Sequence, residues 1–162
     1  MAVQRHFSMP KVYVQQQVGS IVIKHSQLDR VYRLAIKRML DISIDHPLYV
    51  VLTKRKMTGA LRRLAETLIK ANTNERLTNE ERAEVLQLLK DAVAHTELRN
   101  NLVHCTWGRK KGPGEPTELV DDGKKKSMPI PPLADLKKAA TEIDRIRSRL
   151  NVLTRKAAKR TI

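Results

Sequence analysis

The residues best suited to chemistry lie near the middle of the chain, where Arg99, Asn100 and His104 fall within six positions. Arginine binds and neutralises phosphate, histidine can carry a proton at neutral pH, and asparagine can orient either of them. If this segment is a catalytic site, its residue types favour RNA as the substrate. If it is not, the chain is only a basic helical protein.

The spacing of these residues decides how they can act together. On an α-helix, Asn100 and His104 are four residues apart and share a face, whereas Arg99 and His104 are separated by about 140° around the axis. We therefore expect that Arg99 and His104 do not meet on one phosphate along a straight helix. Two arrangements would unite them: the helix ends or distorts at the motif, or a second copy of the motif completes the site across a dimer axis.

A purely structural interpretation of the same residues stays open. Arg99 could pair with an acidic residue such as Glu97 or Asp29. His104 could instead stabilise the C-terminal end of its helix. Trp107, three residues further on, is expected to pack beneath the helix end rather than to stack on a base.

Apolar residues at helical spacing predict the elements that hold the motif. A first helix is expected over about 20–41, because Gly19-Ser20 should break or kink the preceding pattern and Pro47 cannot continue a helix. A second helix is expected over about 57–71. The apolar run 48–52 is expected to be a buried connector or the first turn of that second helix.

The second half of the chain divides into three parts. Thr78, with Glu81 three residues later, has the pattern of a capping box, which predicts a helix over about 79–106 with the motif on its last two turns. Residues 108–132 are rich in Pro, Gly and Lys and predict a long loop with at most a short hairpin. The segment 133–162 repeats apolar residues over three heptads. We expect it to close the core, with a partner-binding coiled coil as the alternative.

The chain of 162 residues carries a net charge of +15. Residues 1–107 have a net charge of +7 and residues 108–162 one of +8, so the last third holds more than half of the excess. Such a charge attracts nucleic acid or an anionic membrane surface without sequence selectivity. The candidate nucleic-acid-binding residues are basic side chains of the loop, for which a solvated charge run is the alternative. They are Arg109, Lys110, Lys111, Lys124, Lys125 and Lys126.

Composition disfavours several other classes of protein. Cys105 is the only cysteine, which excludes an intrachain disulfide and fits a reducing, cytoplasmic setting. No apolar run approaches the ~20 residues that cross a bilayer, and the N-terminus lacks the apolar segment of a signal peptide. His46, His95 and Cys105 lack the spacing of zinc ligands. We therefore expect no membrane association, no metal and no cofactor.

The string from Glu97 to His104, followed by Trp107-Gly108, resembles the signature of the HEPN superfamily, the helical "higher eukaryotes and prokaryotes nucleotide-binding" domains. That signature is an arginine, a polar residue and a following histidine. In this chain they are Arg99, Asn100 and His104, with four residues between the arginine and the histidine. The resemblance covers roughly residues 14–107 and the C-terminal helix.

The resemblance implies metal-independent RNA cleavage, which many members of the superfamily perform. The RNA 2′-OH would attack the adjacent phosphate, with His104 as general base or acid, and the product would carry a 2′,3′-cyclic phosphate. Arg99 would stabilise the charge of the transition state. Asn100 would hold His104 or a phosphate oxygen. Other members bind RNA or nucleotides without cutting, or act as toxins silenced by an antitoxin.

Together these features predict an all-α, HEPN-like bundle of four to five helices. Its parts are an N-terminal tail (1–13), a helical core (14–107), a basic loop (108–132) and a basic C-terminal helix that packs on the core (133–162). The expected function is a cytoplasmic, homodimeric endoribonuclease or RNA-processing toxin, with an antitoxin or another protein as a further partner. The alternatives are a non-catalytic nucleic-acid-binding module and a helical protein–protein interaction module.

Overall fold

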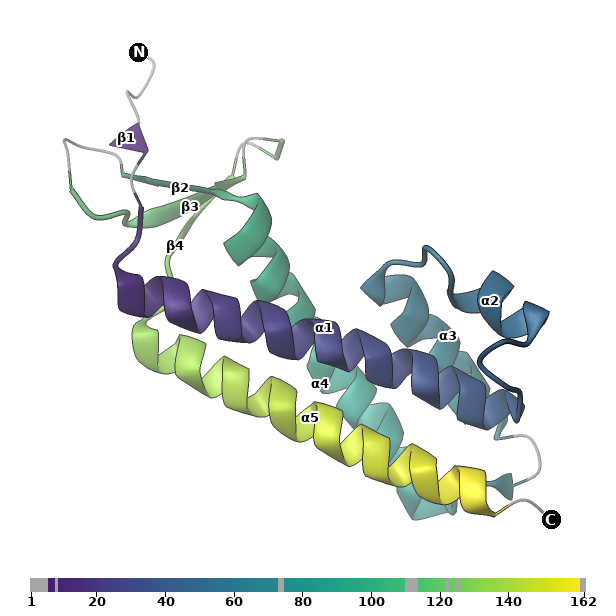
Figure 1. Cartoon of the computed structure of the whole chain (residues 1–162). Helices are drawn as coiled ribbons and strands as arrows, with labels where there is room; N and C mark the ends of the chain where they lie inside the picture. The colour runs from purple at the N-terminus through teal and green to yellow at the C-terminus, as the bar shows by residue number, and fades with distance from the viewer. Residues whose placement is uncertain are drawn as a thin grey trace.

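The computed structural model describes residues 6–7, 9–72, 75–109, 114–121, 123–124 and 126–160. Helices make up most of it, and a small sheet covers one end of the helical bundle (Figure 1). The predicted helical fold class is therefore confirmed. None of the helices in the described ranges combines the length and the apolar character that crossing a bilayer requires.

The helices of the bundle are α1 (Val12–Leu40), α2 (Pro47–Thr53), α3 (Thr58–Ala71), α4 (Asn79–His104) and α5 (Leu133–Lys159). The predicted break at Gly19-Ser20 is wrong, because α1 runs through both residues. A glycine inside a helix costs only about 1 kcal/mol relative to alanine, and the packing of α1 against α5 outweighs that cost. The expected tail 1–13 is also wrong in part, since α1 already begins at Val12.

The apolar run 48–52 is neither a buried connector nor the first turn of α3. It belongs to α2, a separate short helix in which Tyr49 is buried while Leu48 and Val51 are exposed. The N-terminus of α2 is capped by His46, whose Nδ1 accepts the backbone N–H of Leu48 at 3.2 Å. Pro47 follows at the first helical position, where its missing N–H does no harm.

The core lies where the long helices meet. α1 and α5 lie side by side and run in the same direction, and α4 crosses behind them (Figure 1). Every apolar residue of the predicted seam in α5 is buried, which confirms that this helix closes the core. The seam is therefore not free to form a coiled coil with a partner. Its residues are Leu136, Ala139, Ile143, Ile146, Leu150, Leu153 and Ala157.

α4 begins and ends as its sequence predicts. The capping box is present, because Glu81 N–H donates to Thr78 Oγ1 and Thr78 N–H donates to Glu81 Oε2, each at 3.2 Å. At the other end, His104 is the last helical residue. The indole of Trp107 packs against the core, and its Nε1 donates to the carbonyl of Leu102 at 3.1 Å. Trp107 thus supports the end of the helix that carries the motif.

The segment 108–132 is not a loop throughout, as had been expected. Four short strands form an antiparallel sheet in the order β1-β2-β3-β4. Leu119 and Val120 of the third strand are buried, and Leu119 joins the core, so the sheet is fastened to the bundle. The strands are β1 (His6–Phe7), β2 (Thr106–Arg109), β3 (Glu118–Asp121) and β4 (Lys126–Pro129).

Candidate active site

The side chain of Arg99 brings the three motif residues together at the C-terminal end of α4. Its Nη1 donates to Asn100 Oδ1 at 3.0 Å and lies 3.3 Å from His104 Nε2. The expectation that Arg99 and His104 stay apart is therefore wrong. The backbone angle around the helix does separate them, but the long arginine side chain reaches past the helix end, where no further turn intervenes. A single chain thus assembles all three residues.

This contact defines the protonation of His104. A guanidinium group only donates hydrogen bonds, so His104 Nε2 must accept and the ring proton must sit on Nδ1. Asn100 contacts Arg99, and not His104 as the resemblance implies. Nε of Arg99 is buried without a partner, and its Nη2 makes no hydrogen bond within the described part of the chain. Arg99 therefore keeps donors available for an incoming anion.

The motif lines a cleft of about 890 Å³, a volume typical of ligand sites. Four parts of the chain form this cleft: the middle of α1, the connection from α2 into the start of α3, the end of α4, and the turn between β3 and β4. Asn100 and His104 are exposed on its surface. Five basic side chains and two acidic ones line it, so its charge favours an anionic ligand. They are Arg55, Lys56, Arg63, Arg99 and Lys124, with Asp29 and Asp121.

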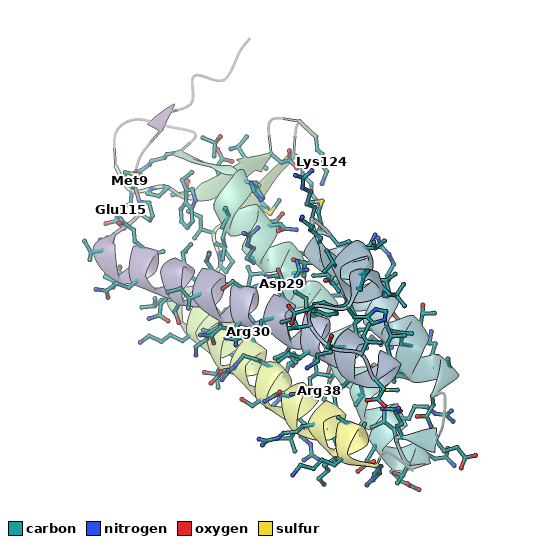
Figure 2. The ribbon with its side chains drawn as sticks, turned by 45° about the vertical axis from the view of Figure 1, so that its right-hand side comes forward. Met9, Asp29, Arg30, Arg38, Glu115 and Lys124 are labelled. Carbon is teal, nitrogen blue, oxygen red and sulfur yellow. The ribbon has the colours of Figure 1, made fainter. Side chains whose placement is uncertain are left out.

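α1 places a carboxylate and a histidine beside the motif. Asp29, labelled at the middle of α1 in Figure 2, accepts the hydroxyl of Thr58 at 2.9 Å through Oδ2, whereas its Oδ1 is buried without a partner. His25 is buried, and its Nε2 lies 3.1 Å from Thr96 Oγ1 on α4. Burial lowers the pKa of His25, and the nearby charge of Arg99 lowers it further, while Asp29 opposes both effects. Asp29 and Arg99 therefore both act electrostatically on one buried ring.

The predicted nucleic-acid-binding residues have different positions. Lys124 lines the cleft, extending from the β3–β4 turn, with its Nζ 3.5 Å from Asp121 Oδ2 (Figure 2). Arg109 lies in β2 and Lys126 in β4, and neither lines the cleft. The guanidinium of Arg109 instead packs against Gly114, leaving no room there for a β-carbon. The other three, Lys110, Lys111 and Lys125, lie outside the described residues.

Sequence reasoning missed three basic residues of the cleft, Arg55, Lys56 and Arg63. A signal was present, because Lys54-Arg55-Lys56 is a basic run as dense as the one chosen in the loop. The run lacked a position, however, because α2 was not recognised as a helix of its own. α2 and its exit determine where this connection lies relative to α4.

No three His, Cys, Asp or Glu side chains gather as metal ligands do in the part of the chain that the structure describes. Comparisons with family models, with curated proteins and with solved structures give no match to this chain. The chemistry of the site is therefore argued from its own residues.

Proposed function

We propose that this protein is a HEPN-type endoribonuclease that cleaves RNA without a metal ion, by attack of the 2′-OH on the adjacent phosphate. The observation that carries the proposal is the contact of Arg99 with both Asn100 and His104 at the surface of a basic cleft. It unites a group that binds phosphate with a ring nitrogen that can take a proton. The resemblance of the motif to the superfamily points to the same reaction.

The reaction begins with an exchange of partners at Arg99. A guanidinium binds a phosphate more strongly than it binds a neutral imidazole, since a charge-assisted hydrogen bond is about twice as strong as a neutral one. The substrate phosphate therefore draws Arg99 away from His104, and the lone pair of Nε2 becomes available to the 2′-OH. The 2′ oxygen gives its proton to Nε2 and forms a bond to phosphorus, while Arg99 stabilises the negative charge of the transition state.

Departure of the 5′ oxygen requires a second proton transfer. The attacking and leaving oxygens are roughly in line on opposite sides of the phosphorus, so one fixed imidazole reaches only one of them. The corresponding histidine of a second copy would reach the other, which is a chemical reason for the expected homodimer. The phosphorus–O5′ bond breaks, O5′ takes the proton, and the products are a 2′,3′-cyclic phosphate and a 5′-hydroxyl.

Substitution of the two charged members of the motif tests the proposal. Arg99→Ala and His104→Ala should each lower the rate of RNA cleavage in EDTA by about 100-fold or more. Cleavage is measured on a single-stranded 12-mer that contains one ribonucleotide among deoxyribonucleotides, which leaves one bond to cut. Arg30→Ala, on an exposed part of α1, is the matched control and should retain full activity. Circular dichroism checks that each variant is folded.

Wild-type protein that leaves diverse RNAs uncut, with and without added metal ions, would contradict the enzymatic proposal. The basic lining of the cleft would then favour the second candidate, a module that binds RNA without cutting it. Binding that weakens steeply with salt would support that second function. A toxin role adds a separate expectation: expression should arrest cell growth, and His104→Ala should relieve the arrest.

A further inference from the structure

A second group of basic side chains lines the same cleft as the motif. Arg55 and Lys56 lie in the connection between α2 and α3, and Arg63 lies in the second turn of α3. All three are exposed. None of their side chains makes an ion pair or hydrogen bond with another described residue. Lys124, by contrast, already faces Asp121. The three positive charges on the α2–α3 side are thus uncompensated.

The backbone that carries these charges is held in place by α1. Arg33 of α1 donates through Nη1 to the carbonyl of Thr53 and through Nη2 to the carbonyl of Lys56, the latter at 3.4 Å. Between them, Arg55 adopts a left-handed backbone conformation with φ of 58°. An arginine bound to two carbonyls at both ends of a three-residue turn limits where that turn can move. The cleft therefore presents Arg55 and Lys56 from a fixed connection.

The same part of the cleft contains an exposed apolar side chain. Met57 follows directly after Lys56, lines the cleft, and is 83% exposed. Its flexible thioether side chain adapts to flat or irregular apolar surfaces. A nucleobase is such a surface, and it is covalently linked to the phosphates that the neighbouring basic residues attract. The combination fits a nucleotide better than it fits a simple anion.

We infer that the cleft binds a single-stranded segment of RNA through at least two phosphates, an inference that rests on the proposed function. The scissile phosphate lies at Arg99 and His104. A flanking phosphate binds Arg55, Lys56 and Arg63, and the intervening base contacts Met57. Side chains reach bases in this way only where the bases are unpaired, because a base in a duplex is stacked and its edges are occupied. The substrate class is therefore unpaired RNA of more than two nucleotides.

The experiment compares two triple variants of equal charge change. The cleft variant is Arg55→Ala/Lys56→Ala/Arg63→Ala. The control variant, Arg30→Ala/Lys138→Ala/Arg155→Ala, removes two arginines and one lysine that are exposed outside the cleft. Each is assayed on the single-ribonucleotide 12-mer and on a dinucleoside monophosphate, which has only the scissile phosphate. Binding is measured separately by fluorescence anisotropy on a 12-mer whose attacking 2′-OH is methylated and cannot react.

The cleft variant should raise KM for the 12-mer by about tenfold or more, since each lost phosphate contact also removes about 0.7 from the salt slope for single strands. Its kcat for the 12-mer and its kcat/KM for the dinucleotide should match wild type. Met57→Ala should weaken binding of the blocked 12-mer without changing the salt slope. The control triple variant should behave as wild type on both substrates, apart from a small general loss of affinity.

The possible outcomes separate this inference from the proposed function. If His104→Ala abolishes cleavage but the cleft variant binds and cuts the 12-mer like the control, the second phosphate site is wrong and the enzyme proposal stands. If wild type cuts nothing but the cleft variant alone loses affinity for the blocked 12-mer, the enzyme proposal is wrong and the binding site stands. Equal or tighter binding of the same sequence as a duplex, lost in the cleft variant, would overturn the preference for unpaired RNA.

Discussion

Two buried atoms of opposite charge at the cleft, Asp29 Oδ1 and Arg99 Nε, have no hydrogen-bond partner. Leaving such an atom unpaired costs roughly 1–3 kcal/mol, so an unpaired buried polar atom calls for an explanation. Both residues act on the pKa of the buried His25, which places their charges within electrostatic reach of one another. Asp29 is therefore well placed to hold the guanidinium of Arg99 where substrate is bound.

Asp29→Asn tests this positioning role, because it removes the charge and keeps an oxygen that can still accept from Thr58. We expect kcat to fall roughly tenfold, equivalent to about 1.4 kcal/mol, because Arg99 loses the charge that orients it. KM should stay unchanged or fall, since the cleft becomes more positive. Steady-state kinetics on the single-ribonucleotide 12-mer separate the two constants. A lower KM with unchanged kcat would mean that Asp29 only repels substrate.

The reaction residues also mark how far sequence reasoning extends at this scale. The types of Arg99, Asn100 and His104 are sufficient to predict phosphate chemistry. Their meeting was not predicted, because a rotation of about 140° around a helix describes where the backbone places two residues and ignores how far an arginine extends. The interpretation of Arg99 as paired to Asp29 was half correct, since the two are electrostatically close although no hydrogen bond joins them.

Among the elements, α3, α4 and α5 were predictable and α2 and the sheet were not. Long helices repeat their apolar residues often enough to be recognised, and the capping box located the start of α4 at Thr78. α2 has seven residues and each strand of the sheet has four or fewer, which is too short for a period to show. These short elements position Arg55 and Lys124, which explains why the cleft as a whole was not foreseen.

The role of α5 in the core leads to a stability prediction. Ile146 lies in its buried seam, whereas Val152 on the same helix is 45% exposed. Ile146→Ala should lower the free energy of unfolding by about 2–5 kcal/mol because it leaves a cavity, and the milder Ile146→Val by about 0.5–1.5 kcal/mol. Val152→Ala should change it by less than about 0.5 kcal/mol. Urea denaturation measures all three, and similar losses at the two positions would contradict the packing of α5.

For the molecule as a whole, the structure relocates the effective positive charge. The last third of the sequence carries most of the excess charge, yet several arginines of α5 are paired with carboxylates. Such pairing reduces the field that α5 presents to a polyanion, whereas the three basic side chains on the α2–α3 side of the cleft are unpaired. The α5 pairs are Arg145 with Glu142, Arg147 with Asp144, and Arg149 with Glu84; Arg160, just after α5, pairs with Glu81.

Stability of the whole fold should fall as the solution becomes mildly acidic. Burial lowers the pKa of both His25 and His95 below the usual 6.5. Below pH 6.5 the unfolded chain therefore binds more protons than the folded one, and the free energy of unfolding decreases with pH. Carboxylates such as Glu84, whose pKa is lowered by its bond to Arg149, lose their contribution only as the pH falls below 4.5. The two windows are separate.

His25→Gln isolates one part of this pH dependence. Glutamine can still donate to Thr96 but does not titrate, so the variant should lose less stability than wild type between pH 7.5 and pH 5.5. Urea unfolding at pH 7.5, 6.5 and 5.5 measures the slope for each protein. An identical slope in the variant would show that His25 does not contribute.

The pairing of the first long helix with the last has a consequence for how the protein is made. While the ribosome is still adding residues at roughly 5–20 per second, α1, α3 and α4 leave the exit tunnel with their apolar faces uncovered, because α5 has not yet been synthesised. The motif on α4 is therefore translated before the helix that completes its scaffold. In a protein proposed to cut RNA, this order of synthesis keeps the nascent chain harmless to the ribosome and messenger that produce it.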